Sequence, residues 1–393
     1  YGRLNFASSF VSLFTFLSTL GLDSIVFRDL VDHEDEKDSI LGTTFVLKLI
    51  GSFVLNLVAL SAVLIIRPTD SSLHLLVFIV AFGYLFKPFD AVAYWFRSKV
   101  RSKYAVLSRT TIKLVISGLK VVFIIFSAPL FAFVAIISFN TLLTSGMYIW
   151  HYYSQTGDSV LRWNFNFKWA KSLLKDSWPL LFSGAATTIH MHIDKVMIGQ
   201  FLGDEQLGIY SAATKLLIFG FFATAMANSL FPHLVDLRER DYDLYRKRFQ
   251  NLLTFLTWGA LFLGVVITIF SGFIIWLIFG PEYQRASLVL SIQIWGAALG
   301  FFGIASAKDL LAENLTKVMM WRTIVGGSAN ILLNYFLIPL YGLIGASIVN
   351  SLSTLVGSIL LLLFWKKTRH LPIMFAKSFH PGNLIEALKF EFL

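Results

Sequence analysis

Eleven apolar segments of membrane length follow one another along this chain of 393 residues, joined by loops mostly too short to fold alone. Their approximate ranges are 4–27, 41–66, 73–96, 105–127, 130–151, 178–201, 209–233, 252–279, 286–311, 318–338 and 342–365. At ~1.5 Å rise per residue, about twenty helical residues cross a ~30 Å hydrocarbon layer. The runs are continuously apolar, whereas barrel strands would alternate. The sequence therefore predicts an all-α integral membrane protein with eleven transmembrane helices.

Composition supports this class. Hydrophobic residues make up 56% of the chain and charged residues 14%, against about 25% charged residues in soluble domains. The net charge of +10 does not indicate nucleic-acid binding, because the cations lie in loops and inside segments, not on one soluble face. The absence of cysteine excludes disulfides and thiolate metal sites.

Nine basic residues interrupt the apolar segments. They are Lys48, Lys87, Arg109, Lys113, Lys120, Lys195, Lys215, Lys308 and Arg322, and only Asp23, Asp90, Asp194 and Asp309 accompany them. A lipid-facing cation at the bilayer centre costs roughly 2.5–3.5 kcal/mol. Most of the nine must therefore line a wet interior or extend to a membrane surface. An excess of interior positive charge favours an anionic cargo.

The loops on the two sides of the predicted membrane differ sharply in charge. One set holds 21 Lys and Arg residues and comprises 28–40, 97–104, 152–177, 234–251, 312–317 and the tail from 366. The opposite set, with the chain start, holds only Arg3, Arg67 and Arg285. Basic loops remain on the cytoplasmic side of a membrane, so we expect the first set to be cytoplasmic.

A weak internal repeat suggests two halves. Pro129–Thr144 aligns with Pro339–Thr354 at an offset of 210. Two bundles with a central cleft are typical of an alternating-access carrier. We expect an N-terminal helical lobe at 1–151, a cytoplasmic inter-lobe loop at 152–177, a C-terminal six-helix lobe at 178–365 and a cytoplasmic tail at 366–393. Six helices in the second lobe and five in the first predict one further helix before Tyr1.

The strongest local pattern is a cationic stripe formed by Arg109, Lys113 and Lys120. At 100° per residue, steps of four and eleven place them within about 40° of one helix face, over roughly 16 Å. Either all three face an anion-filled cleft, or Arg109 extends to the cytoplasmic surface and only the lysines are buried. The first interpretation makes all three candidates for binding an anion.

Further candidates are spread along the chain. Lys215 and Arg322 have no acid nearby in the sequence, and Lys48 resembles them, so these three are additional anion ligands. Lys87 and Asp90 either neutralise each other or act on the cargo. The uncharged segments 130–151, 252–279 and 342–365 are expected to pack on lipid or on neighbouring helices.

One helix face carries a candidate for ion coupling. His190 and Asp194 lie four residues apart with Lys195 adjacent, and a carboxylate beside a histidine can relay protons in a membrane helix. Charge balance between Asp194 and Lys195 is the alternative. Asp194, His190 and Asp90 are the candidates for coupling. No phosphate loop, zinc-protease motif or nucleophile elbow is present, so the sequence indicates neither an enzyme nor a cofactor or metal site.

Short stretches along nearly the whole chain resemble one known family. They read LGLDSIVFRDL at 20–30, ILGTTFVLKL at 40–49, LGDEQLGIY at 202–210, GPEY at 280–283 and PLYGLIGASIVNS at 339–351. In order and spacing they are similar to the polysaccharide biosynthesis protein family, the Wzx-type O-antigen flippases of the MATE-like MOP superfamily. Members usually begin with one more helix than is present here.

The resemblance implies a twelve-helix fold in two six-helix lobes, here without its first helix, in the bacterial inner membrane. It implies export of undecaprenyl-diphosphate-linked oligosaccharide, such as an O-antigen repeat unit of lipopolysaccharide, with polysaccharide polymerase and glycosyltransferases as partners. Two alternatives stay open. A MATE-type drug or cation antiporter should carry an excess of acids in its cleft, and a non-transporting scaffold of a glycan-assembly complex would leave no catalytic motif either.

Overall fold

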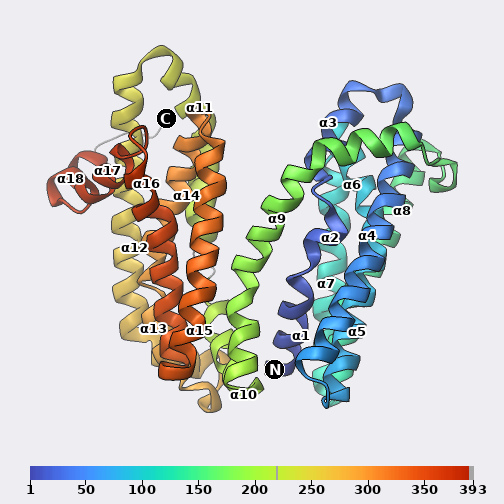
Figure 1. The fold of residues 1–393 in the computed structure, drawn as a ribbon, viewed down its shortest axis with the longest axis horizontal. Coiled ribbons are helices and arrows are strands. Elements are labelled where there is room, and N and C mark those ends of the chain that lie inside the picture. Colours follow the sequence, from blue (N-terminus) through green and yellow to red (C-terminus); the bar gives the residue numbers. More distant parts are fainter. Residues whose placement is uncertain (218–219, 389–393) are drawn as a thin grey trace. The chain divides into compact units, whose positions relative to one another are not determined.

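The computed structural model describes residues 1–217 and 220–388, and the regular elements within these ranges are all helices (Figure 1). The first half contains α1 (Gly2–Ser12), α2 (Thr15–Thr19), α3 (Asp23–Asp32), η1 (Glu34–Glu36), α4 (Lys37–Ile66), α5 (Ser71–Gly83), η2 (Tyr84–Asp90), α6 (Ala91–Ser98), α7 (Lys103–Ile125), α8 (Leu130–Thr156), η3 (Val160–Arg162) and α9 (Phe167–Phe201). The second half contains α10 (Asp204–Lys215), α11 (Gly220–Arg240), α12 (Tyr242–Phe279), η4 (Pro281–Tyr283), α13 (Ala286–Gln293), α14 (Gly296–Ala312), α15 (Thr316–Leu355), the π-helix η5 (Val356–Leu360), α16 (Leu361–Phe364), α17 (His370–Ser378) and α18 (Pro381–Leu388). The prediction of an all-α protein is confirmed.

The chain forms two compact units. Residues Arg3–His192 form the N-unit, and Tyr1–Gly2 with Ile193–Leu393 form the C-unit. The boundary between them lies inside α9. The loop expected at 152–177 is shorter than predicted, because α8 continues to Thr156 and α9 already begins at Phe167.

The early start of α9 has a simple physical cause. Ala170, Leu173 and Ser177 are buried at helical spacing, whereas Lys168 and Lys171 are exposed. This is the pattern of an amphipathic surface helix, whose mean hydropathy is too low to mark it as a membrane segment.

Five of the helical segments described are long and apolar enough to cross a membrane, and the bent pair Gly2–Ser12 with Thr15–Asp32 makes a sixth. The five are Glu34–Ile66, Ser71–Ser98, Leu130–Thr156, Tyr242–Phe279 and Thr316–Phe364. The other expected spans fall on shorter or more highly charged helices, such as α7. The expected span 209–233 covers α10 and α11 and includes residues 218–219, which lie outside the described residues, as do 389–393 of the expected tail. The total of eleven stays a prediction.

Special backbone conformations break the expected segment 4–27 and separate the expected segments 318–338 and 342–365. Between α2 and α3, Leu20 and Gly21 have φ angles of 51° and 67°. In α15, Gly342 has a φ of 58°, and a Cβ on Gly345 would collide with the carbonyl of Leu337. In a straight helix those two residues would be about 12 Å apart, so α15 is a tight helical hairpin. Its two arms match the separate spans expected at 318–338 and 342–365.

In the N-unit, the three loops expected on one side of the membrane lie together. The Arg28 guanidinium contacts the Asp176 carboxylate at 2.7 Å, and the Lys37 ammonium contacts Asp158 at 2.6 Å. Lys99 forms an ion pair with Glu34. These contacts join 28–40, 97–104 and 152–177 at one end of the unit.

The C-unit has a matching end. Arg238 pairs with Glu313 at 3.0 Å, and the Asp309 carboxylate lies 3.5 Å from Arg246 and 3.4 Å from His370. Segments 234–251, 312–317 and the tail therefore meet there. Asp309 is 1% exposed and also accepts a hydrogen bond from the Tyr245 hydroxyl at 2.6 Å. The cytoplasmic assignment of both ends stays a prediction.

Candidate functional site

A polar pocket of ≈ 470 Å³ lies within the N-unit, lined by η2, α7 and α8. On α8, Ser145 donates to the carbonyl of Phe86 in η2 at 2.7 Å, which fixes these two elements. Ile112 and Ile116 of α7 pack against Ile136 of α8 and form an apolar seam. The side chains that emerge beside this seam line the pocket.

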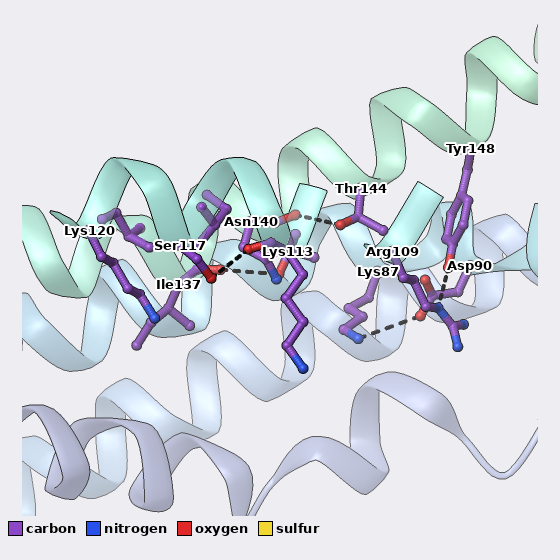
Figure 2. Close-up of a pocket in the computed structure, with 13 residues that line it drawn as sticks. Lys87, Asp90, Arg109, Lys113, Ser117, Lys120, Ile137, Asn140, Thr144 and Tyr148 are labelled. Atoms are coloured by element: carbon purple, nitrogen blue, oxygen red, sulfur yellow. Dashed lines mark hydrogen bonds and ion pairs between the residues drawn. The ribbon is translucent and has the colours of Figure 1, made fainter. Parts of the chain in front are cut away.

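The pocket contains the cationic stripe that the helical period predicted. Arg109, Lys113 and Lys120 all line it, and Figure 2 shows the two lysines extending from α7 on the same side. Within residues 1–217 and 220–388, neither Lys113 nor Lys120 forms an ion pair. The structure thus brings the three residues together in one site. Their expected orientation toward the second lobe stays a prediction.

Arg109 is held by an aromatic side chain. Its Nε–H donates to the hydroxyl of the buried Tyr148, and its guanidinium lies 5.8 Å from the centre of that ring. Arg109 therefore lies at the end of the pocket near η2, with Lys87 and Asp90 (Figure 2). Both interpretations of the stripe, one with all three residues facing an anion-filled cleft and one with Arg109 extending to the cytoplasmic surface, stay predictions.

The pocket has a large excess of positive charge. Its charged lining consists of Lys87, Arg109, Lys113 and Lys120 with the single carboxylate of Asp90. Asp90 lies 3.6 Å from the Lys87 ammonium, as the neutralising interpretation predicted. Three cationic charges therefore remain in the pocket after that pair is set aside.

The wall formed by α8 was missed by sequence reasoning. Asn140, Thr141, Thr144 and Tyr148 line the pocket and carry amide and hydroxyl groups. The segment had been expected only to pack on lipid or on neighbouring helices because it has no charge. The signal that could have found this wall is the recurrence of polar residues at steps of three and four, from Thr141 to Thr144 and from Asn140 through Thr144 to Tyr148, which places them on one side of the helix.

Lys48 lies outside this pocket, and other side chains accept hydrogen bonds from its ammonium. Its side chain is 1% exposed, and its ammonium contacts the Asp23 carboxylate at 3.1 Å and the Tyr94 hydroxyl at 2.6 Å. Tyr94 in turn donates to Asp23. The ammonium already has two acceptors, so Lys48 is a weaker anion-ligand candidate than the pocket lysines.

The remaining candidates belong to the C-unit. Arg322 donates to the Gly303 carbonyl at 3.1 Å and to the hydroxyls of Ser306 and Ser358 at 3.2 and 3.1 Å. The Lys215 ammonium lies 4.9 Å from the centre of the Tyr1 ring. Among the contacts described, those of Arg322 are to uncharged acceptors, so no carboxylate neutralises its charge there.

The coupling candidates lie along α9. Asp194 accepts a hydrogen bond from the Tyr210 hydroxyl at 2.6 Å and one from the backbone N–H of Lys195 at 2.8 Å. His190 precedes Asp194 by one turn of the same helix. Among the contacts described, Lys195 therefore contacts Asp194 through its backbone N–H. The sequence had suggested a charge pair between the two side chains instead.

Comparison with known proteins identifies the family. The profile described as "Polysaccharide biosynthesis protein" matches residues 1–238, and the profile described as "MatE" matches 179–336. The chain belongs to the polysaccharide biosynthesis protein family. The resemblance seen in the sequence motifs is thereby confirmed.

Several curated proteins are similar in sequence to this chain. The capsular polysaccharide biosynthesis protein CapF of Staphylococcus aureus is 26% identical over 221 residues, 55% of each chain. A putative O-antigen transporter of Shigella flexneri is 24% identical over 65% of this chain and 60% of its own. A probable low-salt glycan biosynthesis flippase of Haloferax volcanii is 27% identical over 50% of this chain and 42% of its own. The chain thus spans about half the length of these relatives.

Solved structures show the fold of this family member. The lipid II flippase MurJ, in an inward closed conformation, matches with a TM-score of 0.74 at 16% identity, over 99% of this chain and 90% of that chain. An inward-facing MATE family multidrug transporter of the MOP superfamily matches with a TM-score of 0.71 at 15% identity, over 96% and 91%. The expected MATE-like fold is confirmed, and the chain is a multispan membrane protein.

Proposed function

We propose that this protein moves an undecaprenyl-diphosphate-linked oligosaccharide from the cytoplasmic to the periplasmic leaflet of a bacterial inner membrane. The cargo would be an O-antigen or other surface polysaccharide repeat unit. Family membership and the names of the relatives support this assignment. Transport of this kind needs no chemical step, cofactor or metal.

The observation that carries the proposal is the charge of the N-unit pocket. Three cations in excess of acids are unfavourable near the middle of a membrane unless an anion or water accompanies them. A lipid diphosphate supplies that negative charge at its head, while its tail stays in the bilayer. Lysine and arginine contacts to phosphate oxygens are charge-assisted hydrogen bonds, about twice as strong as neutral ones.

The second wall of the pocket fits the rest of such a cargo. The sugar is attached directly to the diphosphate, so it must lie close to the cations that hold the head. Asn140, Thr141 and Thr144 offer amide and hydroxyl groups of the kind that bind sugar hydroxyls. In this proposal Lys215, Arg322 and Lys48 act as further anion ligands.

A drug or cation antiporter is the main rival. A cationic cargo would be repelled by Lys113 and Lys120, and the pocket's single carboxylate is already paired with Lys87. The charge balance therefore favours an anionic cargo. The polymerase and glycosyltransferase partners belong to the same proposal and follow from the expected role in glycan assembly.

Proteoliposomes containing the purified protein provide the test. A fluorescently labelled lipid-linked oligosaccharide is placed in the vesicles, and its exposure on the outer leaflet is followed by chemical quenching. We expect exposure faster than in protein-free vesicles for the diphosphate-linked lipid, and no acceleration for a neutral glycolipid with the same glycan. Equal rates with and without protein would support a scaffold, and transport of a cationic dye alone would support an antiporter.

A further inference from the structure

The C-unit ends in a segment that the sequence predicted only as a tail. Residues 364–388 follow the last long helix and include α17 and α18, which Figure 1 shows at the side of α12, outside the bundle of long helices. Nothing in the proposed transport path uses this segment. Its contacts and its outward face point to a separate role.

Specific contacts dock α17 onto the bundle. The side-chain amide of Gln250 donates to the Met374 carbonyl and to the Ser378 hydroxyl, each at 3.0 Å. The indole N–H of Trp258 donates to the Ser378 carbonyl, also at 3.0 Å. The Phe375 ring lies 4.6 Å from that of Phe302 in α14. The segment is therefore fixed against α12 and α14 and is not a free tail.

The docking position coincides with the membrane border on α12. Charged side chains on this helix end at Arg248, and the rest of the helix to Phe279 is uncharged. A change from charged to apolar side chains along a membrane-spanning helix marks the passage from headgroups to hydrocarbon. Of the two residues that hold α17, Gln250 lies two residues beyond that change and Trp258 ten residues beyond it, about 15 Å along the helix. The contacts therefore place α17 across the border between headgroups and hydrocarbon.

The outward face of the segment combines two kinds of side chain. Phe364, Ile373 and Ile385 are 79%, 53% and 57% exposed. The exposed basic residues between them are Lys366, Lys367, Arg369 and Lys377, and residues 366–385 contain no Asp or Glu. Large apolar side chains beside unneutralised cations are typical of helices that lie in the membrane interface and bind anionic lipid.

We propose that residues 364–385 form a platform that binds anionic phospholipid headgroups through its basic side chains, while Phe364, Ile373 and Ile385 enter the acyl-chain boundary. The platform is independent of the cargo pocket. A bilayer is always beside this multispan protein, and the charge of the platform is complementary to an anionic headgroup. Lipid contact also removes from water the apolar side chains that the fold leaves uncovered.

The absence of cysteine makes the test direct. A single Ile373→Cys variant of the whole chain, labelled with an environment-sensitive fluorophore, is reconstituted in phosphatidylcholine vesicles or in equal amounts of phosphatidylcholine and phosphatidylglycerol. A label at Asp243→Cys, an exposed position at the same end of the unit, serves as the water-exposed reference. Quenchers attached to lipid headgroups and quenchers dissolved in water report where each label lies.

A triple Lys366→Gln, Lys367→Gln and Lys377→Gln background removes three charges from the platform. Arg369 is left in place because it also donates to the Leu363 carbonyl at 2.7 Å. We expect the ratio of lipid-bound to lipid-free platform to fall about a hundred-fold when three lysines are removed, from the usual contribution of each basic residue near an anionic surface. The matched control removes Lys168, Lys171 and Lys175, three exposed lysines of the N-unit, and should leave the label unchanged.

The expected result is strong lipid quenching at position 373 in phosphatidylglycerol vesicles, weakened by salt and by the platform substitutions alone. Added salt screens the attraction between the platform's basic side chains and the anionic headgroups. Lipid quenching of the label in the protein with all its lysines should therefore also weaken as salt is added, which tests the proposal without any lysine variant. Equal lipid quenching in pure phosphatidylcholine would overturn the recognition of anionic lipid. Water quenching at position 373 equal to that at position 243 would overturn the platform itself.

Discussion

Arg109 donates a hydrogen bond to the hydroxyl of Tyr148 across the contact between α7 and α8, whereas Lys113, one turn further along α7, lies in the same pocket. Within the described residues Lys113 forms no ion pair. The pocket therefore combines a cation fixed by the protein with cations whose charge is available to a ligand. This difference ranks the residues for mutagenesis.

Replacing Lys113 by alanine should slow transport of the diphosphate-linked lipid roughly ten- to hundredfold, because one hydrogen bond to a charged group contributes roughly 1.5–3 kcal/mol. Lys113→Arg keeps the charge and should retain most of the rate. The measurement is the vesicle translocation assay. Leu114→Ala, at an exposed position outside the pocket, is the matched control and should behave like the unsubstituted protein. Equal rates for Lys113→Ala and the unsubstituted protein would remove this lysine from the site.

The cationic stripe could be predicted because it depends only on the period of one helix. Arg109, Lys113 and Lys120 share a face whatever surrounds α7, and the structure places them in one pocket. The all-helical fold is likewise specified by the long apolar runs. The amphipathic first turns of α9 were not predicted as a helix. Their exposed polar residues lower the mean hydropathy of the segment, although one face of it is apolar and buried.

Pairings between distant residues could not be predicted in the same way. Lys48 was grouped with Arg322 because no acid lies near either in the sequence, yet Asp23, 25 residues earlier, contacts its ammonium. Arg322 instead donates to a carbonyl and two hydroxyls. The partners of Lys48 and Arg322 both depend on which helices pack against each other. A single sequence does not specify that packing.

Removing the charge of Lys48 and removing that of its partner Asp23 should have unequal effects on the stability of the protein. Asp23 is 51% exposed and can be hydrated alone, whereas Lys48 is 1% exposed and would keep a buried charge. Asp23→Asn should therefore lower the free energy of unfolding by roughly 3 kcal/mol, and Lys48→Met by clearly less. Denaturant titration in detergent micelles, followed by tryptophan fluorescence, measures both.

The double variant Asp23→Asn with Lys48→Met completes this cycle. It should be more stable than Asp23→Asn alone, because the uncompensated ammonium is gone. Additive losses in the double variant would show that the two side chains do not interact.

Acid should weaken one loop contact of the N-unit. The hydrogen bond from the Lys37 ammonium, assisted by Arg162, lowers the pKa of the Asp158 carboxyl below its ordinary value of 3.8. A carboxyl with a lowered pKa in the folded state contributes stability that is fully present above the ordinary value and is lost as pH falls through the folded value. We expect Asp158→Asn to flatten the decline in thermal stability below about pH 4, the ordinary range of aspartate. An unchanged acid decline in that variant would show that the contact contributes nothing.

Energy coupling is the last prediction. An anion leaving a negatively charged interior is favoured by roughly 2.3 kcal/mol per charge per 100 mV, and return of the empty cationic carrier is favoured by the same field. The excess of cations in the pocket therefore predicts that a membrane potential alone accelerates transport. Proteoliposomes given a potential without a pH gradient, and then the reverse, separate the two driving forces.

Asp194 provides the decisive variant for this test. Its carboxylate accepts a hydrogen bond from Tyr210, so Tyr210→Phe removes that contact while keeping the titratable group, and Asp194→Asn removes the titratable group itself. If the potential drives transport, both variants should still respond to it. If only a pH gradient accelerates transport, and Asp194→Asn loses that response while Tyr210→Phe keeps it, the electrical mechanism is wrong. Protons then drive the cycle through α9, where His190 lies one turn away as the expected second member of the relay.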